Sequence, residues 1–251
     1  MALHHHPTTS EPYLQLPHSN LRLTPPRPSD APAVIAALND PRVYMNALSP
    51  PFPFLAHHFD AWFAAVDTKA RAARADLAAV ERGEKRWVGM GLAFPVIREV
   101  RSKTQADREG EGGEEEEEEV FLGKVEIRRA DYRTVADEAR REKLRRANGG
   151  LEAGDPRIEW EVGFWLVPEA HGRGIMTTVL RTLLDTFFVE YMNVRSLKGS
   201  CLTHNKASKR VLEKCGFVCE NEESDVFEVA ESKTGVKGQR VGAIHMRWRA
   251  A

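Results

Sequence analysis

The stretch from Ile158 to Phe217 constrains the fold of this chain more than any other part of its sequence. Aromatic and β-branched residues over 159–167 predict a strand, and Pro168 ends it because proline cannot continue a hydrogen-bonded ladder. A turn with two glycines, 171–174, then opens a run whose apolar residues recur every three or four positions, which predicts a helix. A second strand and a short helix complete the unit.

The glycine-rich turn predicts a binding site for an anion. Gly172 and Gly174 allow close approach of the backbone, and a helix N-terminus presents free N–H groups and a favourable dipole to negative charge. The turn is therefore a candidate phosphate-binding loop. Taken alone, the motif is equally compatible with a plain helix start in which the glycines serve only the backbone conformation.

The composition is that of an ordinary globular protein. The chain has 251 residues, of which 42% are hydrophobic and 29% charged, enough for one large domain or two small ones. A net charge of −1 provides no general attraction to nucleic acid or to membranes. The 3 cysteines form no CxxC pair, and there is neither a signal-peptide pattern nor an apolar run of about 20 residues. We expect a cytoplasmic protein, with the nucleus as an alternative.

Two charged inserts interrupt the predicted domain. Residues 1–20 are rich in Pro, Ser, Thr and His and are expected to be flexible, so that the domain spans 21–250. An acidic, low-complexity tract at about 98–119 predicts a disordered loop between two paired strands, and a basic one at about 131–157 predicts a short exposed helix. We interpret both as solvated loops; the alternatives are mutual attraction or, for the basic insert, an anionic partner.

The remaining periodicity places strands before, between and after helices. Helices are expected at 31–38 and 56–81, and strands at 21–23, 87–97, 120–128, 218–229 and 241–248. This order favours an α+β (mixed α/β) fold with one sheet in a single domain.

Three motifs, in this order, carry a resemblance to a known family. Residues 161–166 (EVGFWL), 171–176 (HGRGIM), and Asn205-Lys206-Ala207-Ser208 followed by 211–217 (VLEKCGF) resemble the acyl-CoA-binding core of the GNAT N-acetyltransferase superfamily. The similarity is closest to its Rim-type branch, the ribosomal-protein N-terminal acetyltransferases and their small-molecule relatives. It implies a central, mostly antiparallel twisted sheet that is splayed at the cofactor site and flanked by helices.

The resemblance implies acetyl-CoA as co-substrate and no metal. Its binding residues would be Leu166, Val167, His171, Gly172, Arg173, Gly174, Ile175, Met176, Thr177, Asn205 and Ser208. Two of them depart from the family pattern. His171 stands where Arg, Gln or Trp is usual, and Met176 replaces a small residue, so its bulk is expected to crowd the pyrophosphate side.

Acyl transfer to an amine requires a base for the ammonium proton and an acid for the leaving thiolate. Glu159 and Glu161 are two apart and share one face of a strand, and the resemblance makes Glu161 the candidate base, with a pKa raised by burial. The alternative is an exposed charged stripe. Asn205 is expected to cap the following helix. For the acid, the resemblance implies a Tyr a little further along the chain than Ser208. Because no Tyr follows Tyr191 here, Ser208 is the candidate acid, with a water-mediated route as the alternative.

We therefore expect an acetyl-CoA-dependent N-acetyltransferase that works by direct attack in a ternary complex. The acceptor would be a small-molecule amine or a peptide N-terminus, without nucleic-acid or membrane partners, in a monomer or homodimer. The departures at His171 and Met176 and the missing Tyr also fit a non-enzymatic acyl-CoA sensor or scaffold with the same fold.

Overall fold

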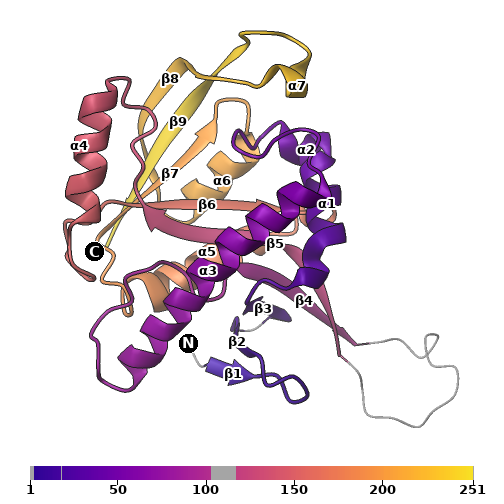
Figure 1. Cartoon of the computed structure of the whole chain (residues 1–251), viewed down its shortest axis with the longest axis vertical. Helices are drawn as coiled ribbons and strands as arrows, with labels where there is room; N and C mark the ends of the chain where they lie inside the picture. Colours follow the sequence, from indigo (N-terminus) through magenta and orange to yellow (C-terminus); the bar gives the residue numbers. More distant parts are fainter. Residues whose placement is uncertain (1–2, 18, 103–116, 251) are drawn as a thin grey trace, which may run out of the picture.

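The computed structural model describes residues 3–17, 19–102 and 117–250, which form a single mixed sheet covered by helices (Figure 1). Its nine strands are ordered β1-β2-β3-β4-β5-β6-β7-β9-β8, and every neighbouring pair is antiparallel except β6 and β7. The strands are β1 (Leu3–His5), β2 (Pro12–Gln15), β3 (Leu21–Thr24), β4 (Val96–Ser102), β5 (Glu117–Arg129), β6 (Trp160–Leu166), β7 (Ser196–Leu202), β8 (Val218–Glu228) and β9 (Arg240–Arg249). The predicted α+β class, with one mostly antiparallel sheet, is confirmed.

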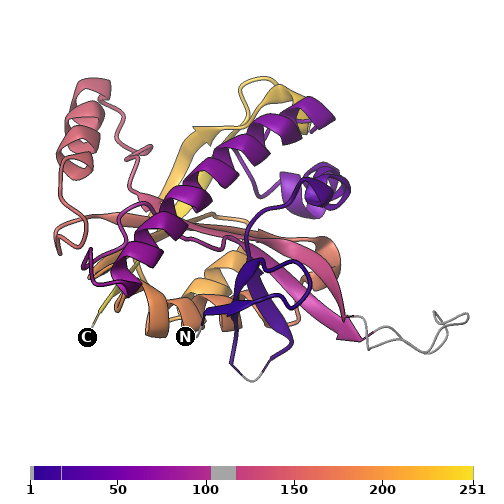
Figure 2. The same ribbon diagram turned by 60° about the horizontal axis from the view of Figure 1, so that its bottom comes forward.

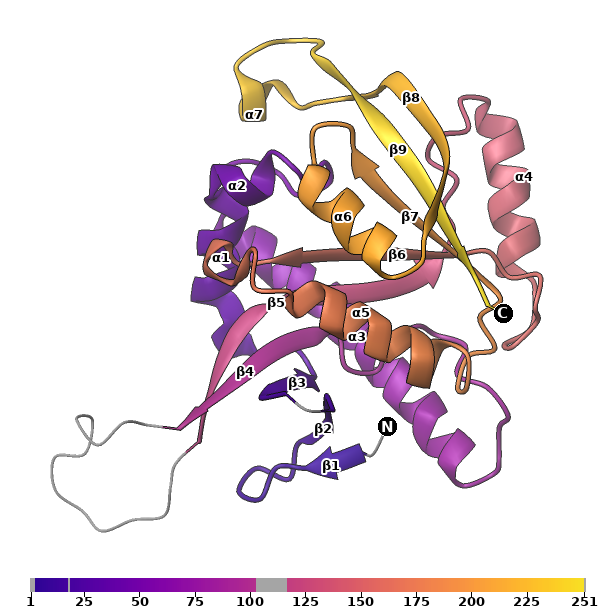
Figure 3. The ribbon, with the colours of Figure 1, turned by 180° about the vertical axis from the view of Figure 1, so that it is seen from behind.

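Helices cover both faces of this sheet. One face carries α1 (Ala31–Asn39), α2 (Pro41–Tyr44) and α3 (Ala56–Glu81), as Figure 2 shows. The other face carries α5 (Ile175–Leu183), its π-helical continuation η4 (Leu184–Phe188), and α6 (Lys206–Lys214), seen from behind in Figure 3. Shorter elements are η1 (Pro28–Asp30), η3 (Pro168–Ala170), α4 (Glu138–Gly149) and α7 (Glu231–Thr234).

Two apolar clusters hold these layers together. The larger one joins α5 and η4 to the sheet through Val179, Leu183 and Phe187, which are fully buried together with Trp160 and Ile97. These helix residues have the three-to-four spacing that predicted the helix, so the sequence period and the buried face agree. The smaller cluster packs α1 and α3 on the opposite face.

The strand expected at 87–97 is wrong for most of its length. Regular pairing begins only at Val96, and residues 87–95 run irregularly. Single hydrogen bonds replace a ladder there: the Val88 N–H donates to the Tyr191 carbonyl at 2.8 Å, and the Gly89 N–H to the Asp76 carboxylate at 3.0 Å. Val88 is nevertheless fully buried. The stretch is apolar because it lines the core, and not because it forms a strand.

The acidic insert and the N-terminal segment contain more regular structure than their composition indicates. Residues 98–102 and 117–119 extend β4 and β5, which pair antiparallel as expected; residues 103–116 of that insert lie outside the described part. Within 1–20, where we expected flexibility, β1 and β2 add to the sheet edge. The basic insert forms the expected helix, α4.

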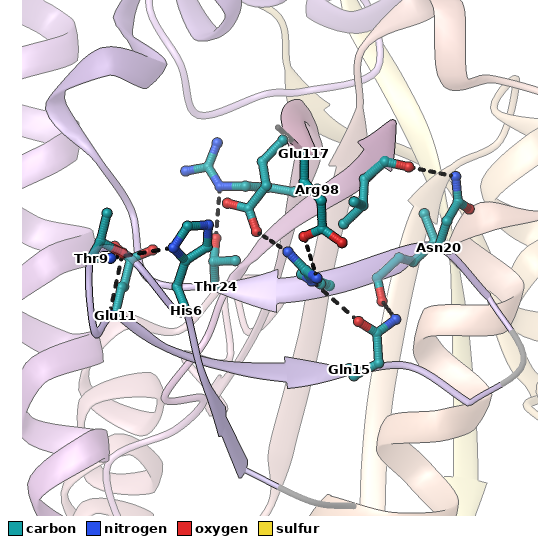
Figure 4. Close-up of polar contacts among 12 residues, drawn as sticks. His6, Thr9, Glu11, Gln15, Asn20, Thr24, Arg98 and Glu117 are labelled. Carbon is teal, nitrogen blue, oxygen red and sulfur yellow. Dashed lines mark hydrogen bonds and ion pairs between the residues drawn. The ribbon is translucent and has the colours of Figure 1, made fainter. Parts of the chain in front are cut away.

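Ionic contacts of Arg22 on β3 and Arg98 on β4 explain why these segments are regular (Figure 4). The Arg22 guanidinium bonds Gln15 at 3.2 Å, Glu117 at 2.8 Å and Glu119 at 3.0 Å, which ties β2 and β3 to the start of β5. Glutamates that would repel one another in a solvated tract are thus neutralised by a cation on β3, which lies two strands away from β5 in the sheet.

A second arginine forms a buried ion pair that joins β4 to η1. Arg98 lies 2.8 Å from the Asp30 carboxylate and donates to the Thr24 hydroxyl at 2.8 Å, with the two charged side chains 3% and 2% exposed. Removing one partner of such a pair leaves the other charge unpaired in the core.

We expect Asp30→Asn to lower the free energy of unfolding by about 3–5 kcal/mol, because Arg98 would keep its charge without a buried anion. Urea denaturation followed by circular dichroism measures this loss. The matched control is Asp67→Asn, whose partner Arg71 is 73% exposed; that change should cost less than about 1 kcal/mol. Equal losses for the two variants would contradict this account of the Arg98 pair.

Candidate functional site

The two parallel strands at the centre of the sheet separate from each other. β6 and β7 pair only from Trp160–Leu197 to Val162–Gly199, after which β6 continues to Leu166 without a strand on that side. The expected splay of the sheet is therefore present. Helix α6 packs directly on β7 at the point of divergence: a Cβ on Gly199 would lie 2.7 Å from the Leu212 side chain. A larger residue at this position would therefore displace the Leu212 side chain.

A cavity of about 620 Å³ lies at this divergence, and we call it the strand-gap cavity. Its walls come from the free end of β6, the turn before α5 and the start of α6. Of the residues predicted to bind the cofactor, those in its walls are Leu166, His171, Gly172, Met176, Asn205 and Ser208. Its lining does not include Val167, Arg173, Gly174, Ile175 or Thr177.

The glycine-rich turn leaves its backbone donors free. The N–H groups of residues 172–177 donate to no acceptor in the described part of the chain, and α5 has no side-chain cap. Gly172 and Gly174 have φ values of 74° and 77°, with open space where a side chain would point. Free donors at the start of a helix form the arrangement that binds an anion.

The unusual residues of the turn have structural partners. The His171 Nε2 atom lies 3.1 Å from the Leu166 carbonyl, which joins the turn to the end of β6. Arg173 forms an ion pair with Glu99 of β4. Met176 is only 3% exposed and belongs to the larger core, and it also lines the strand-gap cavity, so the expected crowding of the pyrophosphate side stays a prediction.

A second cavity, also about 620 Å³, adjoins the first on the face of the sheet, and we call it the sheet-face cavity. The two share wall residues Asn46, Val162, Gly163, Ser200 and Cys201. Glu161 lines the sheet-face cavity, and Ser208 lines the strand-gap cavity. The candidate base and the candidate acid therefore line two adjoining cavities, one on each side of the shared wall residues, which we call the junction.

The two candidate carboxylates have opposite pKa shifts. Burial raises the pKa of Glu161, and its neighbour Arg128, 3.2 Å away, opposes the rise only in part. Burial would also raise the pKa of Glu159, but its hydrogen bond to Lys198 and the charge of Arg247 outweigh burial and lower it. Glu159 is thus a salt-bridged anion beside the strand, whereas Glu161 has the character of a base.

Asn205 has the predicted capping role. Its side-chain oxygen accepts a 3.0 Å hydrogen bond from the Ser208 N–H at the first turn of α6. The cap fixes the backbone that carries Ser208 in the wall of the strand-gap cavity. Cys201 and Cys215 are buried, and burial raises the pKa of each thiol to about 11. They are inert neutral groups at neutral pH.

Sequence reasoning missed several polar residues of the sheet-face cavity. Tyr132, Lys198, Ser200, Glu223 and His245 all line it. Burial, aided by the charge of Glu159, raises the pKa of Tyr132 to about 12, which keeps its hydroxyl protonated. None of these residues lies in a recognisable motif, and they come from four separate parts of the chain.

Two further observations concern the residues that the structure describes. Among them, no group of three or more His, Cys, Asp or Glu side chains gathers closely enough to hold a metal ion. Nor does any helix within 3–17, 19–102 or 117–250 combine the length and apolar character needed to cross a membrane.

Comparison with known proteins places the chain in context. The profile of the acetyltransferase (GNAT) domain matches residues 20–218. No curated protein matches the sequence.

Solved structures share the fold at low identity. A GNAT-family acetyltransferase from Bacillus anthracis is 11% identical at a TM-score of 0.57, covering 94% of this chain and 98% of its own. RimL, a ribosomal alpha-N-protein acetyltransferase in complex with coenzyme A, is 13% identical at a TM-score of 0.52. The match covers 94% of this chain and 97% of RimL. The microcin C7 self-immunity acetyltransferase MccE, in complex with acetyl-CoA and AMP, is 11% identical at a TM-score of 0.51. The match covers 92% of this chain and 93% of MccE.

The pKa shifts predict opposite effects of two similar substitutions. A raised folded-state pKa means that ionisation of Glu161 costs stability above the pKa of the unfolded chain, whereas the lowered pKa of Glu159 means that its ionisation adds stability there. At pH 7, we expect Glu161→Gln to raise the midpoint of thermal unfolding and Glu159→Gln to lower it. The loss of unfolding free energy in Glu159→Gln should be no more than about 1 kcal/mol.

Each variant serves as the control for the other. Both differences from the wild type should vanish below the folded-state pKa of Glu159, where all of these carboxyl groups are protonated. Shifts of the same sign at pH 7, or differences that persist in acid, would contradict the assigned environments.

Proposed function

Because the chain belongs to the acetyltransferase (GNAT) domain family, we propose that it transfers an acetyl group from acetyl-CoA to a primary amine by direct attack in a ternary complex. The observation that carries this proposal is the set of free N–H groups at residues 172–177, of which Gly172 and Met176 belong to the wall of the strand-gap cavity beside the unpaired edge of β6. An anionic, extended ligand with polar groups along its length fits such a surface.

The residues present suit a coenzyme A thioester. The turn before α5 would hold the pyrophosphate through backbone N–H groups, and neither of its glycines has a side chain that would fill the space. The free edge of β6 between Gly163 and Leu166 offers backbone groups to the pantetheine arm, as an added strand would use them. When bound, acetyl-CoA supplies the activated acetyl group.

The base and the acid are assigned to different cavities. Glu161 would accept the first proton of the acceptor ammonium, since burial raises its pKa and it lines the sheet-face cavity. Glu159 is not assigned this role, because Lys198 already holds it at 2.5 Å. Ser208 in the strand-gap cavity would protonate the leaving thiolate.

The acceptor would enter through the sheet-face cavity. Its volume of about 620 Å³ suits a small-molecule amine or the first residues of a peptide. The likeness to RimL, described as a ribosomal alpha-N-protein acetyltransferase, supports the peptide N-terminus as one of the two classes.

Binding of acetyl-CoA tests the assignment of the turn. We expect saturating acetyl-CoA to raise the melting temperature of the wild type, and Gly174→Ala to weaken binding at least tenfold in calorimetry, because a Cβ at φ 77° strains the turn. Gly238→Ala is the matched control, since Gly238 has φ 71° and equally open surroundings away from both cavities. Both variants should lose similar stability, about 1–2 kcal/mol.

Only Gly174→Ala should affect the ligand. No thermal shift with acetyl-CoA in the wild type would overturn the proposed function, and equal weakening by both variants would remove the turn from the binding site.

Turnover tests the base. With acetyl-CoA and a panel of acceptors, namely spermidine and a peptide with a free N-terminal serine, we expect Glu161→Gln to lower kcat by about 10²–10⁴-fold without changing the affinity for acetyl-CoA, because general base catalysis typically contributes that much. Release of the coenzyme A thiol measures the rate. Binding of acetyl-CoA without thiol release for any amine would favour the non-enzymatic acyl-CoA sensor.

A further inference from the structure

Three polar side chains on β7, β8 and β9 lie next to one another outside the predicted motifs. Ser200 and His245 lie opposite each other in the antiparallel pairing of β7 and β9, with the Ser200 Oγ 3.0 Å from the His245 Nδ1. The His245 Nε2 lies 3.7 Å from a carboxylate oxygen of Glu223 on β8. All three residues line the sheet-face cavity.

The geometry favours one tautomer of His245. If the Ser200 hydroxyl donates to Nδ1, the ring proton resides on Nε2, which faces Glu223. Nε2 is buried and has no hydrogen-bond partner among the described residues, so no other group competes for that proton.

Burial favours the neutral form of His245. Burial lowers its pKa; Glu223 and Glu220 oppose that shift, and Lys198 adds to it. Arg247, two residues along β9, is itself paired with Glu220 at 2.6 Å. A neutral imidazole with a carboxylate on its far side is stabilised when it becomes protonated.

Ser200 occupies the place where two reactants would meet. It belongs to the walls of both cavities, together with Asn46, Val162, Gly163 and Cys201. None of these neighbours can pass on a proton at neutral pH: Asn46 is an amide, Val162 and Gly163 have no polar side chain, and burial holds the Cys201 pKa at about 11. Of these shared wall residues, only Ser200 is hydrogen-bonded to a base.

Resting on the acetyl transfer proposed above, we propose that Ser200, His245 and Glu223 form a proton relay that takes up the proton released when the C–N bond forms. Glu161 accepts the first proton of the ammonium. As the amine nitrogen bonds the acetyl carbon and the C–S bond breaks, the second nitrogen proton passes to the Ser200 Oγ and the Ser200 proton to the His245 Nδ1. The thiolate receives the Ser208 proton, which water replaces.

This scheme conserves protons and gives each group one task. The nitrogen loses two protons, one to Glu161 and one to the relay, and the thiolate gains one. Ser200 touches the reacting nitrogen and is the catalytic group, whereas His245 and Glu223 act through it. Glu161 lines only the sheet-face cavity and can prepare the amine before it reaches the junction.

Kinetics of four variants test the relay, with acetyl-CoA and the same two acceptors, spermidine and the serine peptide. Ser200→Ala and His245→Gln should each lower kcat by about 10–100-fold, and the double variant should be no slower than the slower single one, because the residues act as a unit. His57→Gln, an exposed histidine on α3, is the matched control and should keep full activity.

The pH profile separates the relay from a structural role. The wild-type acidic limb should contain two ionisations, those of Glu161 and His245, and His245→Gln should remove one of them while the affinity for acetyl-CoA stays unchanged. Nitrogen-15 spectra of the histidine rings, which need no turnover, should show His245 protonated on Nε2, with a titration that shifts in Ser200→Ala.

Each other result has a definite meaning. An Nδ1-protonated His245, full activity in Ser200→Ala, or additive losses in the double variant would overturn the relay while leaving the transferase assignment in place. Wild-type protein that acetylates neither acceptor would overturn the proposed function and the relay together.

Discussion

The separation of β6 from β7 is the constraint on which the rest of the site depends. Parallel pairing stops after Val162 and Gly199, and α6 packs against β7 at that point through Leu212. The free edge of β6, the turn with its unpaired N–H groups, and the cap at Asn205 then surround one cavity. Continued pairing of the two strands would close that space.

Local environment, rather than residue type, divides the roles of the acidic residues. Glu159 precedes the first residue of β6 and Glu161 lies within it, only two positions further on, yet ion pairing with Lys198 lowers the pKa of Glu159 and burial raises the pKa of Glu161. The glutamates at the start of β5 show the same dependence. Neutralised by Arg22, they form an ordered strand instead of a solvated tract.

The sequence was sufficient where local chemistry and tertiary contacts favour the same structure. Helix α3 begins and ends at the predicted residues, the basic insert forms a helix, and Asn205 caps α6. It was insufficient at 87–95, where burial made an irregular segment resemble a strand, and at 98–102 and 117–119, the described ends of the acidic insert, where composition indicated disorder. In each case the deciding partner lies far away in the sequence, such as Tyr191 for Val88 or Arg22 for Glu117.

The sequence by itself determined the turn, the helix that follows it, the strand carrying Glu161, and the family to which they point, because these depend on residues close together in the chain. Only the tertiary structure decided which side chains share a cavity. Ser200 and His245 carry no local signal, and they meet because β7 and β9 pair in one register. Register depends on the packing of whole strands, so the residues on each side of the candidate site become neighbours only when the sheet is complete.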